Sequence, residues 1–194
     1  MTEIKLRNNV ANTFAGNASS AIYRATTIEM IYFQFRKILE LIALGSFVAN
    51  KDLFSKAYKN FSKHWNARLL IKHIERINPD FYPRPIIQKQ ISVSESGPKQ
   101  FEWLDRPDDY LTKAELLKLY VDCNNIMHAK NPYDSQVDYA MYEKKLSYWG
   151  SRIVNLLNAH YIRLVNDPNL YLIQIQMASL DTKPNYTIFA PYKI

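Results

Sequence analysis

The stretch "SAIYRATTIEMIYFQFRKILELIALGSFVAN", from Ser20 to Asn50, decides the fold. Apolar residues recur along it at steps of three and four, the spacing that places side chains on one face of an α-helix. These residues are Ile28, Ile31, Phe35, Leu39 and Ile42. The serine before the run suits a helix N-cap, and the asparagine after it suits a stop. The pattern predicts one long helix with a continuous apolar face.

Further helices are predicted downstream, over residues 51–65, 66–77, 112–130 and 135–165. Thr112 and Glu115 have the spacing of a capping box, in which each side chain bonds the backbone N–H of the other residue. The last three of these segments run up to an Asn-Pro or Asp-Pro pair. We expect the helices to end there, because the residue before a proline disfavours helical backbone.

Two segments lack the helical pattern. Residues 1–19 are rich in Asn, Thr and Ser without a sustained period, which predicts an irregular N-terminal arm. Residues 79–111 hold five of the nine prolines. We expect a long Pro-rich loop or small insertion there, with "IIQKQISV" as one short strand.

The C-terminal residues 170–194 change to a period of two, which is the signal of a β-strand. Ile173, Ile175 and Met177 alternate with glutamines, and "DTKPN" predicts a turn into the returning strand "YTIFAPY". The predicted fold class is therefore mainly α. It is a helical bundle of about five helices, with the Pro-rich excursion and a C-terminal β-hairpin, in a single domain over residues 20–194.

Composition limits the function classes. The chain has 194 residues, one cysteine (Cys123) and four glycines. These counts exclude an internal disulfide and argue against a glycine-rich phosphate loop, and no Cys/His spacing is typical of a zinc site. We therefore expect no metal and no cofactor. The sequence shows no secretory signal pattern, and its longest apolar stretch, residues 39–49, is too short to span a bilayer. It predicts a cytoplasmic protein without a membrane partner.

The net charge of +7 and the isoelectric point of about 9.3 permit binding to a polyanion. Six cationic side chains fall between residues 51 and 72 against the single carboxylate of Asp52. They are Lys51, Lys56, Lys59, Lys63, Arg68 and Lys72. This run is consistent with phosphate contacts. The default interpretation is a solvated helix face, because most of the interleaved aromatic residues fit the core stripe better, and phosphate contact is the minority alternative.

His128, in "CNNIMHAKNPY", is the first candidate catalytic residue. Helical spacing places it on one face with Asn124, in the last turn of the helix predicted over 112–130. An imidazole that titrates near neutral pH suits general acid–base catalysis. The alternative is a helix C-terminal histidine that bonds free carbonyl groups and favours the helix dipole.

Arg36 and Glu40 form the second candidate, with Glu29 on the same face of the long helix. Charged residues on a largely apolar helix must pair or face a cleft. Arg36 could bind a phosphate or stabilise a developing anion. The alternative is an ordinary ion pair between residues four positions apart.

The order of these parts resembles the HEPN superfamily. A long early helix bears Arg36 and Glu40, and a later helix ends in "DCNNIMHAKNP" with His128. Active members of that superfamily carry an Arg that four to six residues separate from the His. No Arg has this spacing before His128, where the chain has Asp122, Cys123 and Asn124. The literal spacing occurs in "RLLIKH", from Arg68 to His73, inside a basic amphipathic helix.

The resemblance implies an α-helical bundle, often a homodimer. It implies a metal-independent ribonuclease of toxin–antitoxin or phage-defence systems, or a non-catalytic module that binds RNA or a nucleotide. His128 would be the general acid or base. Arg36 or Lys130 would stabilise the charge of the phosphorane. The asparagines at Asn124, Asn125 and Asn131 would orient His128 or the phosphate. The basic run would hold RNA. The remaining alternative is a structural or protein-interaction domain whose hairpin adds a strand to a partner.

Overall fold

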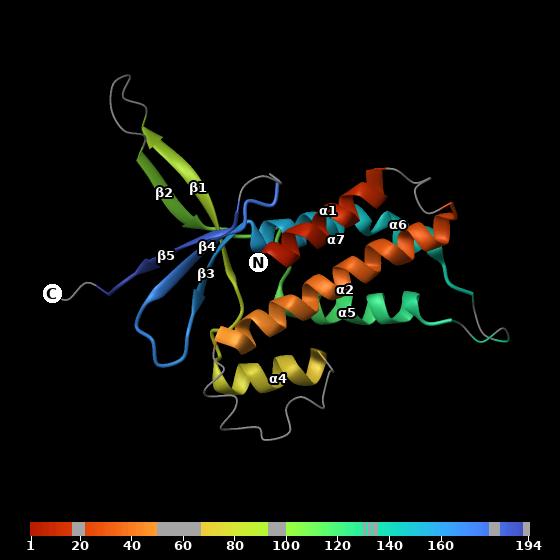
Figure 1. Ribbon diagram of the computed structural model, residues 1–194, viewed down its shortest axis with the longest axis horizontal. Helices are drawn as coiled ribbons and strands as arrows, with labels where there is room; N and C mark the ends of the chain where they lie inside the picture. Colours follow the sequence, from red (N-terminus) through yellow and green to blue (C-terminus); the bar gives the residue numbers. More distant parts are fainter. Residues whose placement is uncertain are drawn as a thin grey trace.

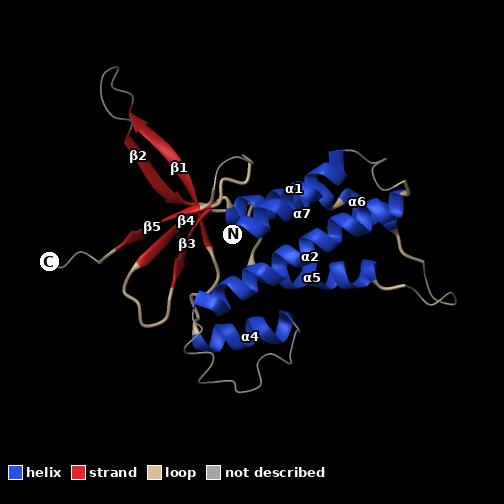
Figure 2. Cartoon of the chain, viewed as in Figure 1, coloured by secondary structure: helices blue, strands red, loops and turns tan. Residues whose placement is uncertain are grey.

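The structure is a computed structural model that describes residues 1–16, 22–49, 67–92, 100–129, 131, 133, 136–178 and 183–191. Helices gather at one end of the molecule and strands at the other (Figure 2). The chain is therefore mixed α/β, with a five-stranded antiparallel sheet in place of the predicted single hairpin. The helix predicted over 51–65 lies outside the described residues.

Helix α2, Arg24–Ala49, runs through the middle of the helical part (Figure 1). The prediction of one long helix is confirmed. Its five marker residues, Ile28, Ile31, Phe35, Leu39 and Ile42, are all buried. The apolar spacing therefore located both the helix and its core face.

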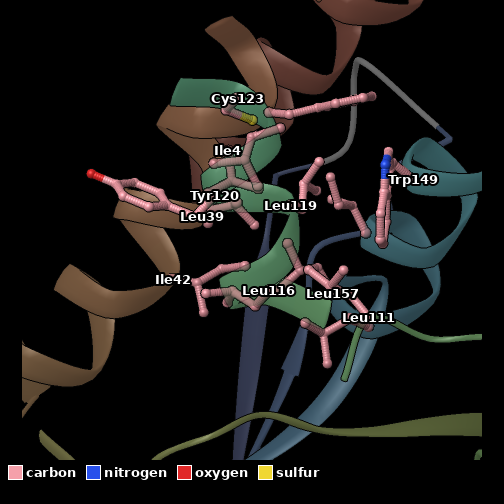
Figure 3. Close-up of a cluster of buried hydrophobic side chains, with 14 of the residues drawn as sticks. Ile4, Leu39, Ile42, Leu111, Leu116, Leu119, Tyr120, Cys123, Trp149 and Leu157 are labelled. Carbon is pink, nitrogen blue, oxygen red and sulfur yellow. The ribbon is translucent and has the colours of Figure 1, made fainter. Parts of the chain in front are cut away.

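The other helices pack around α2. They are α1 (Thr2–Gly16), α4 (Ala67–Ile77), α5 (Lys113–Met127), α6 (Tyr139–Lys144) and α7 (Leu146–Leu157). Helices α1, α4, α5 and α6 all contact α2 directly. Side chains of α1, α2, α5 and α7 meet in one core, where Ile4, Leu39, Leu116 and Trp149 lie together (Figure 3).

A polar contact pins α6 to α2 inside this core. The Tyr32 hydroxyl donates to the backbone carbonyl of Tyr142 at 3.1 Å. The two rings meet edge to face, with centroids 5.2 Å apart. Tyr32 is fully buried. Without this bond the hydroxyl would be buried without a partner, and such an unsatisfied group costs about 1–3 kcal/mol.

The sheet has the strand order β2-β1-β3-β4-β5 and is antiparallel throughout. Its strands are β1 (Arg84–Ser92), β2 (Gln100–Asp105), β3 (Ala159–Arg163), β4 (Leu170–Gln174) and β5 (Asn185–Phe189). The predicted C-terminal hairpin is present as β4 and β5. Two residue pairs, Arg84↔Tyr161 and Pro85↔His160, join β1 to this C-terminal part. The β1–β2 hairpin projects away from the helices (Figure 1).

The prediction of an irregular arm over residues 1–19 is wrong for Thr2–Gly16, which form α1. Ile4, Asn8 and Ala11 are buried on one side of this helix, whereas Leu6 is 54% exposed on the other. Polar residues thus contribute to the buried face, so α1 lacks the apolar stripe that identifies a helix in sequence. Its stability comes from packing on α2 rather than from its own amphipathicity.

The long loop expected over residues 79–111 is replaced in its main part by a β-hairpin, because β1 and β2 pair over six register positions from Ile86↔Asp105 to Ser92↔Gln100. The short strand predicted at "IIQKQISV" is confirmed, since its described residues lie in β1. The prolines of residues 79–111 gave the appearance of a loop. Pro79 and Pro83 precede β1, and Pro85 is its second residue. A proline at the start of a strand interrupts few ladder bonds.

The single helix predicted over residues 135–165 is also wrong. It is divided at Lys145 into α6 and α7, and Ala159–Arg163 form β3. Asn158 marks the end of α7 by bonding to the segment that follows β4. Its carbonyl accepts from Ile175 N–H at 2.9 Å, and its side-chain oxygen accepts from Met177 N–H at 2.9 Å. These bonds span 17 and 19 residues, which a local pattern does not reveal.

The central role of α2 yields a stability prediction. Leu39→Ala removes a fully buried side chain and should lower the free energy of unfolding by about 2–5 kcal/mol. Val48→Ala on the same helix changes a side chain that is 67% exposed and should cost less than about 0.5 kcal/mol. Urea unfolding followed by circular dichroism measures both. Equal losses in the two variants would contradict the assigned core face.

Candidate functional site

Arg36 lies in an ion-pair cluster on α2. Its Nε is 3.0 Å from Glu40 Oε1, and Lys37 Nζ is 3.1 Å from Glu40 Oε2. The Arg36 guanidinium also lies over the ring of Tyr120 on α5, 5.4 Å from its centroid. The cluster therefore matches the ion-pair alternative for Arg36 and Glu40.

This environment keeps the Arg36 guanidinium charged. Partial burial opposes the charged form, but the hydrogen bond that Arg36 donates to Glu40 and the interaction with Tyr120 outweigh it and raise the pKa of Arg36. Glu29, farther toward the start of α2, accepts from the Tyr139 hydroxyl. This bond raises the pKa of Tyr139 to about 12. The polar face of α2 is thus largely engaged in contacts within the chain.

His128 is the C-cap of α5, with an extended backbone at φ −93° and ψ 131°. Its side chain is exposed, and Asn124 is half-buried one turn before it. Val121 on the same face is 49% exposed, so this face points to solvent. Among the described residues, no side chain pairs with the His128 ring. The imidazole is accessible, but nothing in the described part of the chain orients it.

The structure does not bring Arg36 and His128 into contact. Arg36 lies against Tyr120, and His128 follows Tyr120 by eight residues, about 12 Å along an α-helix. Cys123, which lies between Tyr120 and His128 in the sequence, is fully buried, and this burial raises the pKa of its thiol. It is a core thiol, as its place on the apolar helix face predicted. The cation that would face His128 is therefore not Arg36 within one protomer.

The predicted nucleic-acid contacts fall largely outside the description. Lys56, Lys59, Lys63 and Lys130 are not among the described residues, and for Arg68 only the backbone in α4 is described. Lys72 is exposed on α4. Asn131 is exposed as well, and its side-chain oxygen accepts from Tyr133 N–H at 3.1 Å. The role of this group in RNA binding stays a prediction.

A cavity of about 470 Å³ lies at the opposite end of α5, where that helix begins. It is formed by the chain around the start of β1, the end of β2 and the first residues of α5. Tyr82 and Tyr110 contribute aromatic walls. Its charged lining residues are Asp80, Arg84, Asp105, Arg106 and Lys113. Three cations thus face two carboxylates in one hollow.

The three cations differ in how they are paired. Arg84 forms an exposed ion pair with Asp80 at 3.3 Å, and Lys113 pairs with Glu75 of α4. The Arg106 backbone N–H donates to the carbonyl of Pro85 at 2.9 Å. Its side-chain Nε is buried without a hydrogen-bond partner among the described residues. Arg106 therefore lines the cavity with a permanently charged side chain whose Nε is unused among the described residues.

The capping box at the start of α5 is confirmed. The Thr112 side chain accepts from the backbone N–H of Glu115 at 3.2 Å, and Glu115 Oε2 accepts from the Thr112 N–H at 3.0 Å. Arg152 of α7 binds the same carboxylate at 3.1 Å, and the Tyr148 hydroxyl donates to it at 2.7 Å. The Tyr82 hydroxyl also donates to the carbonyl of Leu111 at 2.6 Å. These bonds fix the chain at the start of α5, where it lines the cavity.

Local sequence patterns do not reveal this cavity, because its lining residues are far apart in the chain. Lys113 is separated from Arg84 by the whole β1–β2 hairpin, of which only one strand was expected. The one local signal was the dense group of prolines, tyrosine and arginine in "PDFYPRP". Only the antiparallel pairing of β1 with β2 returns Asp105 and Arg106 to the start of β1.

Comparison of the chain with protein-family models, with curated proteins and with solved structures found no match. Within the described part of the chain, no group of three or more His, Cys, Asp or Glu side chains could hold a metal ion. The described helices also include none with the length and apolar character needed to cross a membrane. The function is therefore argued from the site itself.

The capping network predicts a pH dependence. Partial burial of Glu115 opposes ionisation, but bonds from Thr112, Tyr148 and Arg152 outweigh it and lower its pKa from 4.5 to about 2. Because the folded pKa is the lower one, the ionised carboxylate stabilises the fold above pH 4.5. This contribution is lost as pH falls toward 2.

Glu115→Gln should therefore lower the melting temperature by about 3 °C at pH 7, as expected for the loss of about 1 kcal/mol at a helix cap. The difference from the unmodified chain should shrink between pH 4.5 and pH 2. Glu102→Gln, at an exposed position on β2, controls for the loss of a carboxylate. A difference for Glu115→Gln that stays constant across this range would contradict the network.

Proposed function

We propose that this chain binds RNA or a nucleotide, and that a phosphate group of the ligand occupies the cavity at the start of α5. The observation that carries the proposal is the buried Arg106 Nε, which has no partner in the described part of the chain, beside a cavity that Arg84 and Lys113 also line. Guanidinium groups bind phosphate oxygens through charge-assisted hydrogen bonds.

The start of α5 supports the same assignment. The positive end of a helix dipole favours an anion, and free N–H groups in the first turn add donors. The capping box engages the N–H groups of Thr112 and Glu115 and leaves those of the two intervening residues for a ligand. Tyr110 is a half-buried aromatic wall on which a base could stack. The overall charge of +7 would attract a polyanion.

Arg106→Gln tests the phosphate contact. It should weaken binding of a fluorescein-labelled single-stranded RNA about tenfold or more, because hydrogen bonds to charged groups contribute about 1.5–3 kcal/mol. It should also reduce the slope of log affinity against log salt by about one. Fluorescence anisotropy at several salt concentrations measures both quantities.

Lys89→Gln is the matched control, because Lys89 is an exposed cation on β1 that does not line the cavity. It should change affinity much less than Arg106→Gln does. Equal affinity of the Arg106→Gln variant and the unmodified chain would overturn the cavity as the phosphate site. Binding of a protein partner without salt dependence would favour the interaction-domain alternative.

Ribonuclease activity of the HEPN-like kind is a second candidate, favoured by the exposed imidazole of His128 at the end of α5. A homodimer could bring a cation of the second protomer to it. In this proposal the activity serves a toxin or defence system, as in the superfamily that the chain resembles.

His128→Ala should then abolish cleavage of single-stranded RNA in the presence of a metal chelator, while the circular dichroism spectrum stays unchanged. Asn125→Ala, at an exposed neighbouring position, should reduce cleavage less. Cleavage at the same rate in the His128→Ala variant would exclude His128 as the acid or base. RNA binding without cleavage by the unmodified chain would identify a non-catalytic module.

A further inference from the structure

His160 on β3 is buried, with only 1% of its surface exposed. Its Nδ1 lies 3.1 Å from the carbonyl oxygen of Leu157. A carbonyl oxygen can only accept a hydrogen bond, so Nδ1 must carry the proton. In a neutral ring the other nitrogen, Nε2, then carries a lone pair. It is an acceptor that points away from the Leu157 bond.

The Nε2 atom has no hydrogen-bond partner among the described residues. Burial lowers the pKa of His160 to about 4, so the ring is neutral at physiological pH. A buried acceptor without a donor costs about 1–3 kcal/mol. Such groups in native proteins are usually satisfied by water or by a bound molecule.

His160 lines a second cavity, of about 60 Å³, between the N-terminal end of α1, the C-terminal half of α2 and β3. Most of its wall is apolar and includes Ile4, Ile42, Phe81, Leu157 and Ile162. Met1 and Gly45 also line it and are exposed, so the cavity opens to the surface. The His160 ring therefore borders an apolar hollow that a molecule can enter.

Water alone suits this hollow poorly, because a buried water typically forms two to four hydrogen bonds. The polar lining consists of His160, Ser46 and the exposed Arg163. A volume of 60 Å³ holds about two water-sized groups. One hydroxyl group with its adjoining methylene group fills that space, and an alkyl chain can continue along the apolar mouth.

We propose that this cavity binds an aliphatic primary alcohol, whose hydroxyl group donates a hydrogen bond to His160 Nε2 and whose alkyl chain contacts the apolar walls. The ligand is uncharged, because a charged group would lose its hydration in an apolar site. This site is separate from the proposed phosphate cavity and independent of it. The two share one lining residue, Pro83.

The test compares two isomers, 1-butanol and methyl propyl ether, which contain the same atoms and differ in the hydroxyl donor. The histidine rings are followed by two-bond ¹H–¹⁵N correlation spectra of the full chain. 1-Butanol should shift the His160 Nε2 resonance in a saturable manner. The ether should bind roughly tenfold more weakly, because it leaves the acceptor unpaired.

Two variants assign the response to the cavity. His160→Gln should remove the shifting resonance, and Tyr161→Phe, at the next residue on the opposite face of β3, should leave it unchanged. Gly45→Leu adds a side chain at the mouth, in space that is open around Gly45. Leucine favours the helix over glycine, so this variant should fold and should weaken 1-butanol binding several-fold.

Equal affinities for the alcohol and the ether would overturn the proposal, because the acceptor would then play no part. An Nε2 resonance that no addition of 1-butanol shifts would also overturn it and would indicate that water satisfies the ring. Undiminished binding in the Gly45→Leu variant would place the alcohol elsewhere.

Discussion

The packing of helices on α2 is the constraint on which the rest of the structure depends. Helices α1, α4, α5 and α6 all contact this one element, and its fully buried residues include Tyr32, Ile38 and Leu39. Because α5 is held along α2, the two ends of α5 are fixed in different surroundings (Figure 1). One end meets the β1–β2 hairpin at a charged cavity, and the other presents His128 to solvent.

This arrangement changes the interpretation of the candidate residues. Arg36 and Glu40 are on one face of α2, as helical spacing predicted, but they bind each other, and Arg36 also lies over the Tyr120 ring. This pair therefore contributes to the packing of α2 against α5. Arg106, beyond the end of β2, is a cationic residue whose Nε has no hydrogen-bond partner among the described residues. The proposal of phosphate binding therefore rests on a part of the chain that was expected to be a loop.

The features that the sequence could predict are local. Three- and four-residue spacing predicted α2, and the Thr112–Glu115 pair predicted the start of α5. Helix α1 was missed because its buried face includes Lys5 and Asn8, which α2 covers. Strand β3 was missed because it is formed by pairing with other segments. Its partner β1 lies far earlier in the chain, and its partner β4 follows it. The cavity was missed because it depends on the same long-range pairing.

The most direct test of phosphate binding at the start of α5 is a titration of the full chain with adenosine 5′-monophosphate, followed by backbone and arginine-side-chain ¹H–¹⁵N spectra. The proposal predicts the largest saturable shifts at the Arg106 Nε–H and at the backbone N–H groups of Lys113 and Ala114. Shifts centred on Asn124 and His128 instead, with the start of α5 unchanged, would contradict it.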